Sequence, residues 1–128
     1  MERWILVGLG GMIGTLLRYG TGGLIAKLKG GATFPVETLV INVAGCLAIG
    51  FLAVLSETRG IFDPSARGFL FVGLLGGFTT FSTFGYETFH LLREGQLAAG
   101  LTSIALQIVL GLGAVWGGAA LARLVGGS

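Results

Sequence analysis

The stretch that decides the fold lies at residues 68–92 and reads GFLFVGLLGGFTTFSTFGYETFHLL. It carries no charged residue before Glu87, and it exceeds the roughly 20 mostly apolar residues that a helix needs to cross a bilayer. The stretch therefore predicts a membrane-spanning helix. Because the pair Gly76-Gly77 followed by Thr79-Thr80 makes a poor helix interior, we expect this helix to break there, near the middle of the membrane.

Three further stretches of similar length surround it, at residues 4–26, 36–55 and 97–121. Of the 128 residues, 53% are hydrophobic and only 11% are charged, with a mean hydropathy of +0.89. An ordinary soluble domain has about 25% charged residues. The connectors between the stretches are short, charged and rich in glycine or proline. The sequence predicts an all-α integral membrane protein in which residues 1–128 form one domain of four transmembrane helices, the third broken.

The positive charges that flank the helices are almost evenly divided between the two ends of such a bundle. The two groups are Arg3, Arg59, Arg67 and Arg123 at one end and Lys27, Lys29 and Arg93 at the other. Since this charge asymmetry sets the orientation of a membrane protein, two outcomes stay open: a single orientation, or insertion both ways followed by antiparallel pairing of two copies. The net charge of +2 is too small and too scattered to indicate nucleic-acid binding.

Polar residues inside the spans are candidates for function, because they are costly in lipid. In the first helix, Arg18 either reaches toward the membrane interface or attracts an anion. In the second, Asn42 either bonds to a neighbouring helix or donates to a ligand.

The third helix carries the largest group of polar residues. Helical spacing places Thr80, Thr83 and Glu87 on one face, beside an aromatic edge that contains Phe81 and Phe84. A break in the helix just before these residues exposes backbone carbonyls. A bound cation is one possible partner for such carbonyls. The sequence has no Ser-His-Asp set, P-loop or dinucleotide fingerprint, and it does not predict an enzyme.

The run from Gly76 to Phe84, Gly-Gly-Phe-Thr-Thr-Phe-Ser-Thr-Phe, resembles the signature of the Fluc/CrcB family of fluoride channels. Residues 14–19, which include Arg18, and residues 38–45, which include Asn42, look like two further elements of that family. The resemblance covers all four helices in order and spacing. The nine-residue run is highly specific, and the other two elements support it.

The resemblance implies a multi-pass protein of the cell (inner or plasma) membrane that exports fluoride passively. It also implies an antiparallel, dual-topology homodimer with two fluoride pathways and a structural sodium ion (Na+) at the dimer centre. The backbone carbonyls of Gly76 and Thr79 would hold the sodium ion, and Asn42 would donate to fluoride, whose water must be replaced by such donors. Phe81 and Phe84 would line the pores through the positive edges of their rings.

The remaining pathway residues implied by the resemblance are Thr38, Thr80, Ser82, Thr83 and Glu87, with Arg18 as the cation of the vestibule. The fourth helix departs from family members that carry a Tyr or Ser toward the pore. Here Ser103 and Gln107 lie on that stretch, so the resemblance assigns them no role.

Two rival functions remain at this point. A small multidrug-type cation exporter is also a four-helix protein, but it needs a carboxylate deep in its first helix, where this chain carries Arg18. A membrane-anchored structural or metal-binding subunit would conduct no ions. Fluoride flux therefore separates the three classes.

Overall fold

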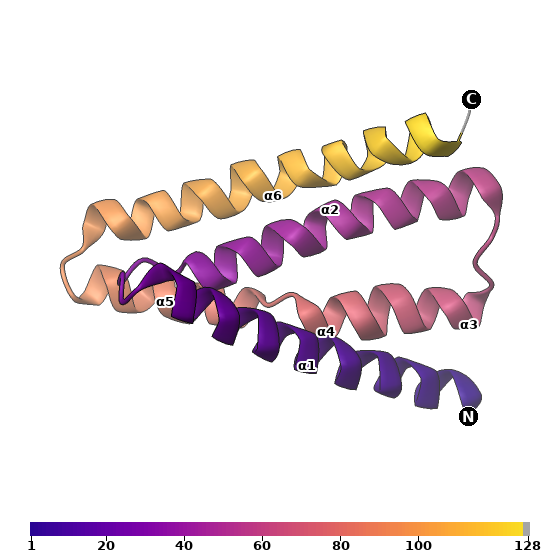
Figure 1. The fold of residues 1–128 in the computed structure, drawn as a ribbon, viewed down its shortest axis with the longest axis horizontal. Helices are drawn as coiled ribbons and strands as arrows, with labels where there is room; N and C mark the ends of the chain where they lie inside the picture. The colour runs from indigo at the N-terminus through magenta and orange to yellow at the C-terminus, as the bar shows by residue number, and fades with distance from the viewer. Residues whose placement is uncertain (127–128) are drawn as a thin grey trace.

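The computed structural model describes residues 1–126, and all regular secondary structure in that range is helical. The chain forms four long helical stretches that alternate in direction (Figure 1). They are α1 (Glu2–Lys29), α2 (Val36–Arg59), the composite of α3 (Pro64–Arg67), η1 (Gly68–Leu75), α4 (Gly76–Phe78) and α5 (Phe81–Arg93), and α6 (Leu97–Gly126). The prediction of an all-α protein is confirmed.

The second and fourth stretches begin at the expected residues, Val36 and Leu97, but every stretch ends later than the apolar runs do. Charged residues such as Lys29 and Arg59 continue the helices past the apolar segment and suit the negative ends of the helix dipoles. Gly30 and Gly60 then end α1 and α2 in the left-handed conformation, with φ of 64° and 60°. Hydropathy alone thus underestimates the helix lengths.

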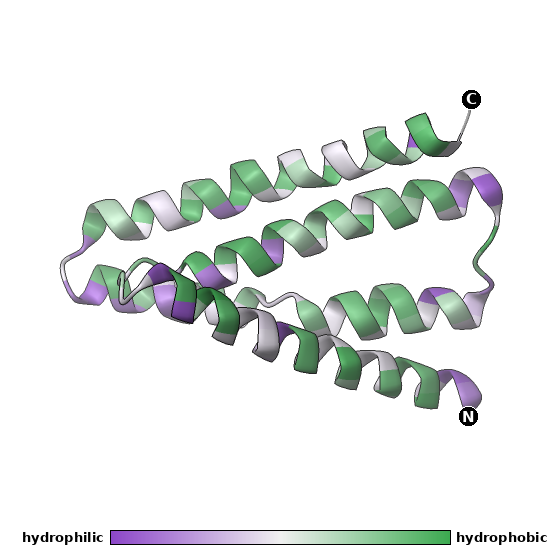
Figure 2. Cartoon of the chain, in the orientation of Figure 1, coloured by the Kyte–Doolittle hydropathy of each residue, from purple (hydrophilic) through white to green (hydrophobic). Residues whose placement is uncertain are grey.

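Three stretches are long and apolar enough to cross a membrane: Val36–Arg59, Pro64–Arg93 and Leu97–Gly126. The fourth expected span, α1, has the length but is not among them, because its glycines and Arg18 lower its hydropathy. Figure 2 shows apolar residues along the helices and polar residues gathered toward helix ends and connecting turns. Among the described residues no large side chain is fully buried, so most of the apolar surface faces outward.

The bundle consists of two helix pairs, because α1 packs on η1 and α4 while α2 packs along α6. Glycines allow both close approaches. A Cβ atom at Gly14 of α1 would overlap the carbonyl of Leu74, and a Cβ at Gly118 of α6 would overlap the carbonyl of Leu47. Contacts of α1 with α2 and of α5 with α6 join the pairs. This arrangement brings the interrupted third stretch next to both α1 and α2.

Candidate functional site

The third stretch is interrupted at Thr79 and Thr80, within the run of glycines and threonines where a break is predicted. Gly76 and Gly77 remain helical, whereas Thr79 and Thr80 have extended backbones, with ψ of 159° and 117°. The amide of Thr79 still donates to the carbonyl of Leu75 at 3.0 Å, and its hydroxyl donates to the same oxygen at 2.9 Å. The interruption thus lies within the expected run of residues 76–80, at its two threonines and not at its two glycines.

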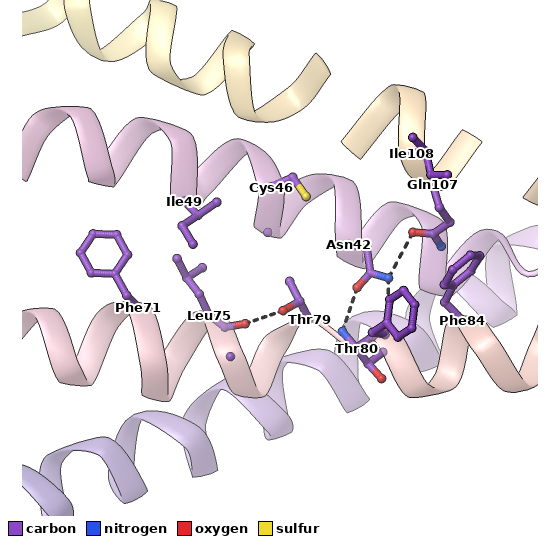
Figure 3. A pocket seen from close by; sticks show the side chains of 13 residues that line it. Asn42, Cys46, Ile49, Phe71, Leu75, Thr79, Thr80, Phe84, Gln107 and Ile108 are labelled. Atoms are coloured by element: carbon purple, nitrogen blue, oxygen red, sulfur yellow. Dashed lines mark hydrogen bonds between the residues drawn. The ribbon is translucent and has the colours of Figure 1, made fainter. Parts of the chain in front are cut away.

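Asn42 of α2 supplies the hydrogen bonds that the interruption removes from the helix. The amide of Thr80 donates to Asn42 Oδ1 at 2.8 Å, and Asn42 Nδ2 donates to the carbonyl of Thr80 at 3.0 Å (Figure 3). In a continuous helix, the amide of Thr80 would donate to the carbonyl of Gly76. The side chain of Asn42 thus replaces the helical acceptor of the Thr80 amide and leaves the Gly76 carbonyl without that donor.

Hydroxyl groups begin α5 immediately after the interruption. The Thr80 hydroxyl accepts from the amide of Thr83 at 3.2 Å and donates to the Thr83 hydroxyl at 3.0 Å. The Ser82 hydroxyl lies 3.3 Å from the same oxygen of Thr80. Because Thr80 occupies the N-cap position, its hydroxyl satisfies one of the free amides at the helix start. Three of the predicted pathway hydroxyls therefore lie together.

Two cavities border this segment. The smaller, of about 400 Å³, is lined by Asn42, Phe81, Phe84 and Gln107 among others, and Gly76 and Thr79 also border it. The larger, of about 860 Å³, is lined by Arg18, Thr38, Thr83 and Glu87 among others. Thr80 lines both cavities, so the predicted site residues other than Ser82 all border one cavity or the other.

The two phenylalanines at the smaller cavity contact each other edge to face. Their ring centroids are 5.5 Å apart with an interplanar angle of 68°. Phe84 is half-buried, but 81% of Phe81 is exposed in the single chain. Interior packing within one chain thus does not explain Phe81.

The larger cavity contains a polar pair that joins α2 to α5. The hydroxyl of Thr38 donates to Glu87 Oε1 at 2.8 Å, while Glu87 Oε2 is buried and has no hydrogen-bond partner among the described residues. Arg18 borders the same cavity and is half-buried. At its rim, Lys29 Nζ contacts both carboxylate oxygens of Glu37, at 2.7 and 2.8 Å. This ion pair was not predicted from the sequence, although the two charges flank a turn that contains two glycines.

Gln107 of α6 is the further residue that the structure brings to the site. Its Oε1 accepts the second N–H of Asn42 at 3.2 Å. From the sequence this residue had no assigned role. A polar amide near the middle of a mostly apolar helix was the available signal.

Comparison with known proteins points to one family. Residues 5–119 match a family model described as "CrcB-like protein, Camphor Resistance (CrcB)". A protein of Methylobacillus flagellatus named "Fluoride-specific ion channel FluC" is 44% identical over 124 residues, which cover 97% of both chains. Proteins of the same name from Nitratidesulfovibrio vulgaris (42% identity; 98% of this chain and 100% of the relative) and Solibacter usitatus (46%; 94% and 98%) are also similar.

Proposed function

Since this chain belongs to the CrcB family, whose similar members are named fluoride-specific ion channels, we propose that it is a fluoride-selective channel that exports the ion passively. The family is one of channels and not of enzymes. The chain is accordingly a multi-pass protein of the cell membrane. Export relieves fluoride toxicity whenever the ion accumulates inside the cell.

The observation that carries this function is the pair of cavities that meet at Thr80. Fluoride is small and strongly hydrated, so a pathway has to offer hydrogen-bond donors in place of water. The hydroxyls of Thr80, Ser82 and Thr83 lie together at this point, and the rings of Phe81 and Phe84 present positive edges. An anion attracted by Arg18 in the larger cavity would then pass Thr38 and Glu87 toward Thr80 and the smaller cavity.

The proposed channel has four membrane crossings in one domain, with α1 as the fourth. At 1.5 Å per residue, the 28 residues of α1 extend about 42 Å, more than the roughly 30 Å of a hydrocarbon core. Its packing on η1 and α4 supports its place in the membrane beside the three apolar stretches. In this arrangement the third crossing is the broken one.

The functional unit is an antiparallel homodimer. Gly76 and Phe81, which border the smaller cavity, are exposed in the single chain, and a second copy would cover this face. The near-equal division of positive charge, four against three, favours insertion in both orientations. Pairing would bring the two interruptions to a common centre.

A structural sodium ion would occupy that centre, held by the carbonyls of Gly76 and Thr79 from each copy. The oxygen of Gly76 lacks the helical donor that Thr80 gives to Asn42, and it lies beside the extended Thr79. Unpaired carbonyls suit a hard cation. Within residues 1–126 no cluster of His, Cys, Asp and Glu side chains could hold a metal, so backbone oxygens are the available ligands.

Reconstitution of the purified chain in liposomes tests the function. We expect rapid efflux of fluoride and little efflux of chloride, measured with ion-selective electrodes. Equal rates for the two anions, or no flux at all, would exclude a fluoride channel. Proton-coupled uptake of an organic cation would instead indicate the multidrug-type exporter.

A further inference from the structure

The amide of Asn42 has no free donor in this structure. A primary amide carries two N–H donors, of which one binds the carbonyl of Thr80 and the other binds Gln107 Oε1. Its oxygen accepts from the amide of Thr80. Hydrogen bonds to Thr80 and to Gln107 therefore hold the Asn42 amide in place. Any anion that approaches Asn42 also meets Gln107, which accepts its second N–H.

The contact with Asn42 engages only the oxygen of the Gln107 side chain. Figure 3 shows the nitrogen of this amide on the side of Phe84, and both residues line the smaller cavity. Gln107 is half-buried on α6, whereas Asn42 and Phe84 come from α2 and α5. The N–H group of Gln107, which is free among the described residues, thus lies between the Asn42 amide and the ring of Phe84.

Resting on the channel function proposed above, we propose that Gln107 is a further specificity-determining residue. Its oxygen holds the Asn42 amide against the interruption, and its N–H group donates to fluoride beside Phe84. Fluoride depends more strongly on such donors than chloride does, because it loses more hydration on entering a narrow pathway. Gln107 therefore favours fluoride over chloride in addition to supporting transport.

The test uses the purified full-length chain in liposomes, with the efflux of fluoride and of chloride measured separately. Gln107→Met keeps the length and flexibility of the side chain but removes its donors and its acceptor. We expect fluoride efflux to fall about tenfold or more, as for the loss of a hydrogen bond to a charged group, and the ratio of fluoride to chloride efflux to fall with it. Gln96→Met is the matched control, since Gln96 is exposed in the turn before α6 and lines neither cavity.

Wild-type rates of fluoride efflux and unchanged selectivity in Gln107→Met would overturn the proposal. If that variant does not fold, Gln107→Glu decides, because it keeps an oxygen for Asn42 and has no N–H donor. Wild-type fluoride efflux in Gln107→Glu would exclude the donor role. Absence of fluoride flux in the unchanged protein would instead refute the channel function, so the two failures are distinguishable.

Discussion

Asn42 and Thr80 show how a single side chain compensates for a gap in a membrane helix. Two hydrogen bonds, of 2.8 and 3.0 Å, connect one amide side chain to both backbone groups of one residue. In lipid an unpaired backbone group is expensive, so this reciprocal pair is what makes the extended conformation tolerable. From the sequence, Asn42 was either an interhelical link or a ligand donor. The structure shows the link, in which both N–H groups of Asn42 are engaged within the chain, and the donor role stays a prediction.

At the same scale, the two phenylalanines are predicted to serve transport more than stability. Phe81→Ile and Phe84→Ile remove a ring edge that faces the anion, so we expect fluoride efflux to fall about tenfold. Dimer elution in size-exclusion chromatography should be unchanged. Phe89→Ile is the control, because Phe89 is exposed on α5 and lines neither cavity. Normal efflux in both pore variants would assign the rings to packing.

The bond between Thr38 and Glu87 gives a second residue-scale prediction. Thr38→Val keeps the shape of the side chain but removes the donor to Glu87 Oε1, whose second oxygen already lacks a partner among the described residues. We expect a loss of about 1–3 kcal/mol in the free energy of unfolding, measured by thermal unfolding in detergent. Thr102→Val, at an exposed position of α6, should change stability little. Equal stability of the two variants would contradict the prediction.

At the scale of elements, the sequence predicts where helices begin better than where they are interrupted. Apolar length located the helices, since membrane spans are set by bilayer thickness. Propensity indicated a break within the run of glycines and threonines at residues 76–80, but it did not separate the glycines, which stay helical, from the threonines, which do not. Of the two glycines, Gly77 packs closely on Gly11 of α1. The interruption lies where a side chain 38 positions earlier, Asn42, offers replacement bonds. The π-helix η1 has no simple sequence signal either.

The packing of α2 on α6 predicts opposite effects for two glycines of one helix. Gly118→Ala places a Cβ against the carbonyl of Leu47, and we expect it to destabilise the fold by about 1–3 kcal/mol. Gly113→Ala meets nothing within 4 Å and should be neutral or stabilising by up to about 1 kcal/mol. Thermal unfolding of the two variants in detergent measures the difference. If Gly113→Ala is the more harmful variant, the pairing of α2 with α6 is wrong.

At the scale of the whole molecule, the distribution of positive charge and the exposed face around Phe81 bear on orientation in the membrane and on pairing with a second copy. Both termini of the described chain lie at one end of the bundle, together with the turn between α2 and α3 (Figure 1). Lys27, Lys29 and Arg93 lie near the other end. The exposed face around Phe81 is where the proposed second copy would pack.

Changing the balance of charge should separate the two orientations. Glu94→Lys with Gln96→Lys adds positive charge at one end, and Glu57→Lys with Ser65→Arg adds it at the other. We expect each double variant to insert in one orientation, as shown by the accessibility of a C-terminal tag, and to lose fluoride efflux when expressed alone. Co-expression of the two should restore efflux. Full activity of either variant alone would contradict the antiparallel dimer.

The hydrogen bonds of Asn42 also imply an order of assembly during synthesis. Asn42 precedes the interruption along the chain, so α2 is already available when Thr80 leaves the ribosome, whereas Gln107 follows later. A nascent chain that ends before α6 can form the paired bonds to Thr80, but it leaves one donor of Asn42 unused. The last helix to enter the membrane is therefore the one that completes the amide pair.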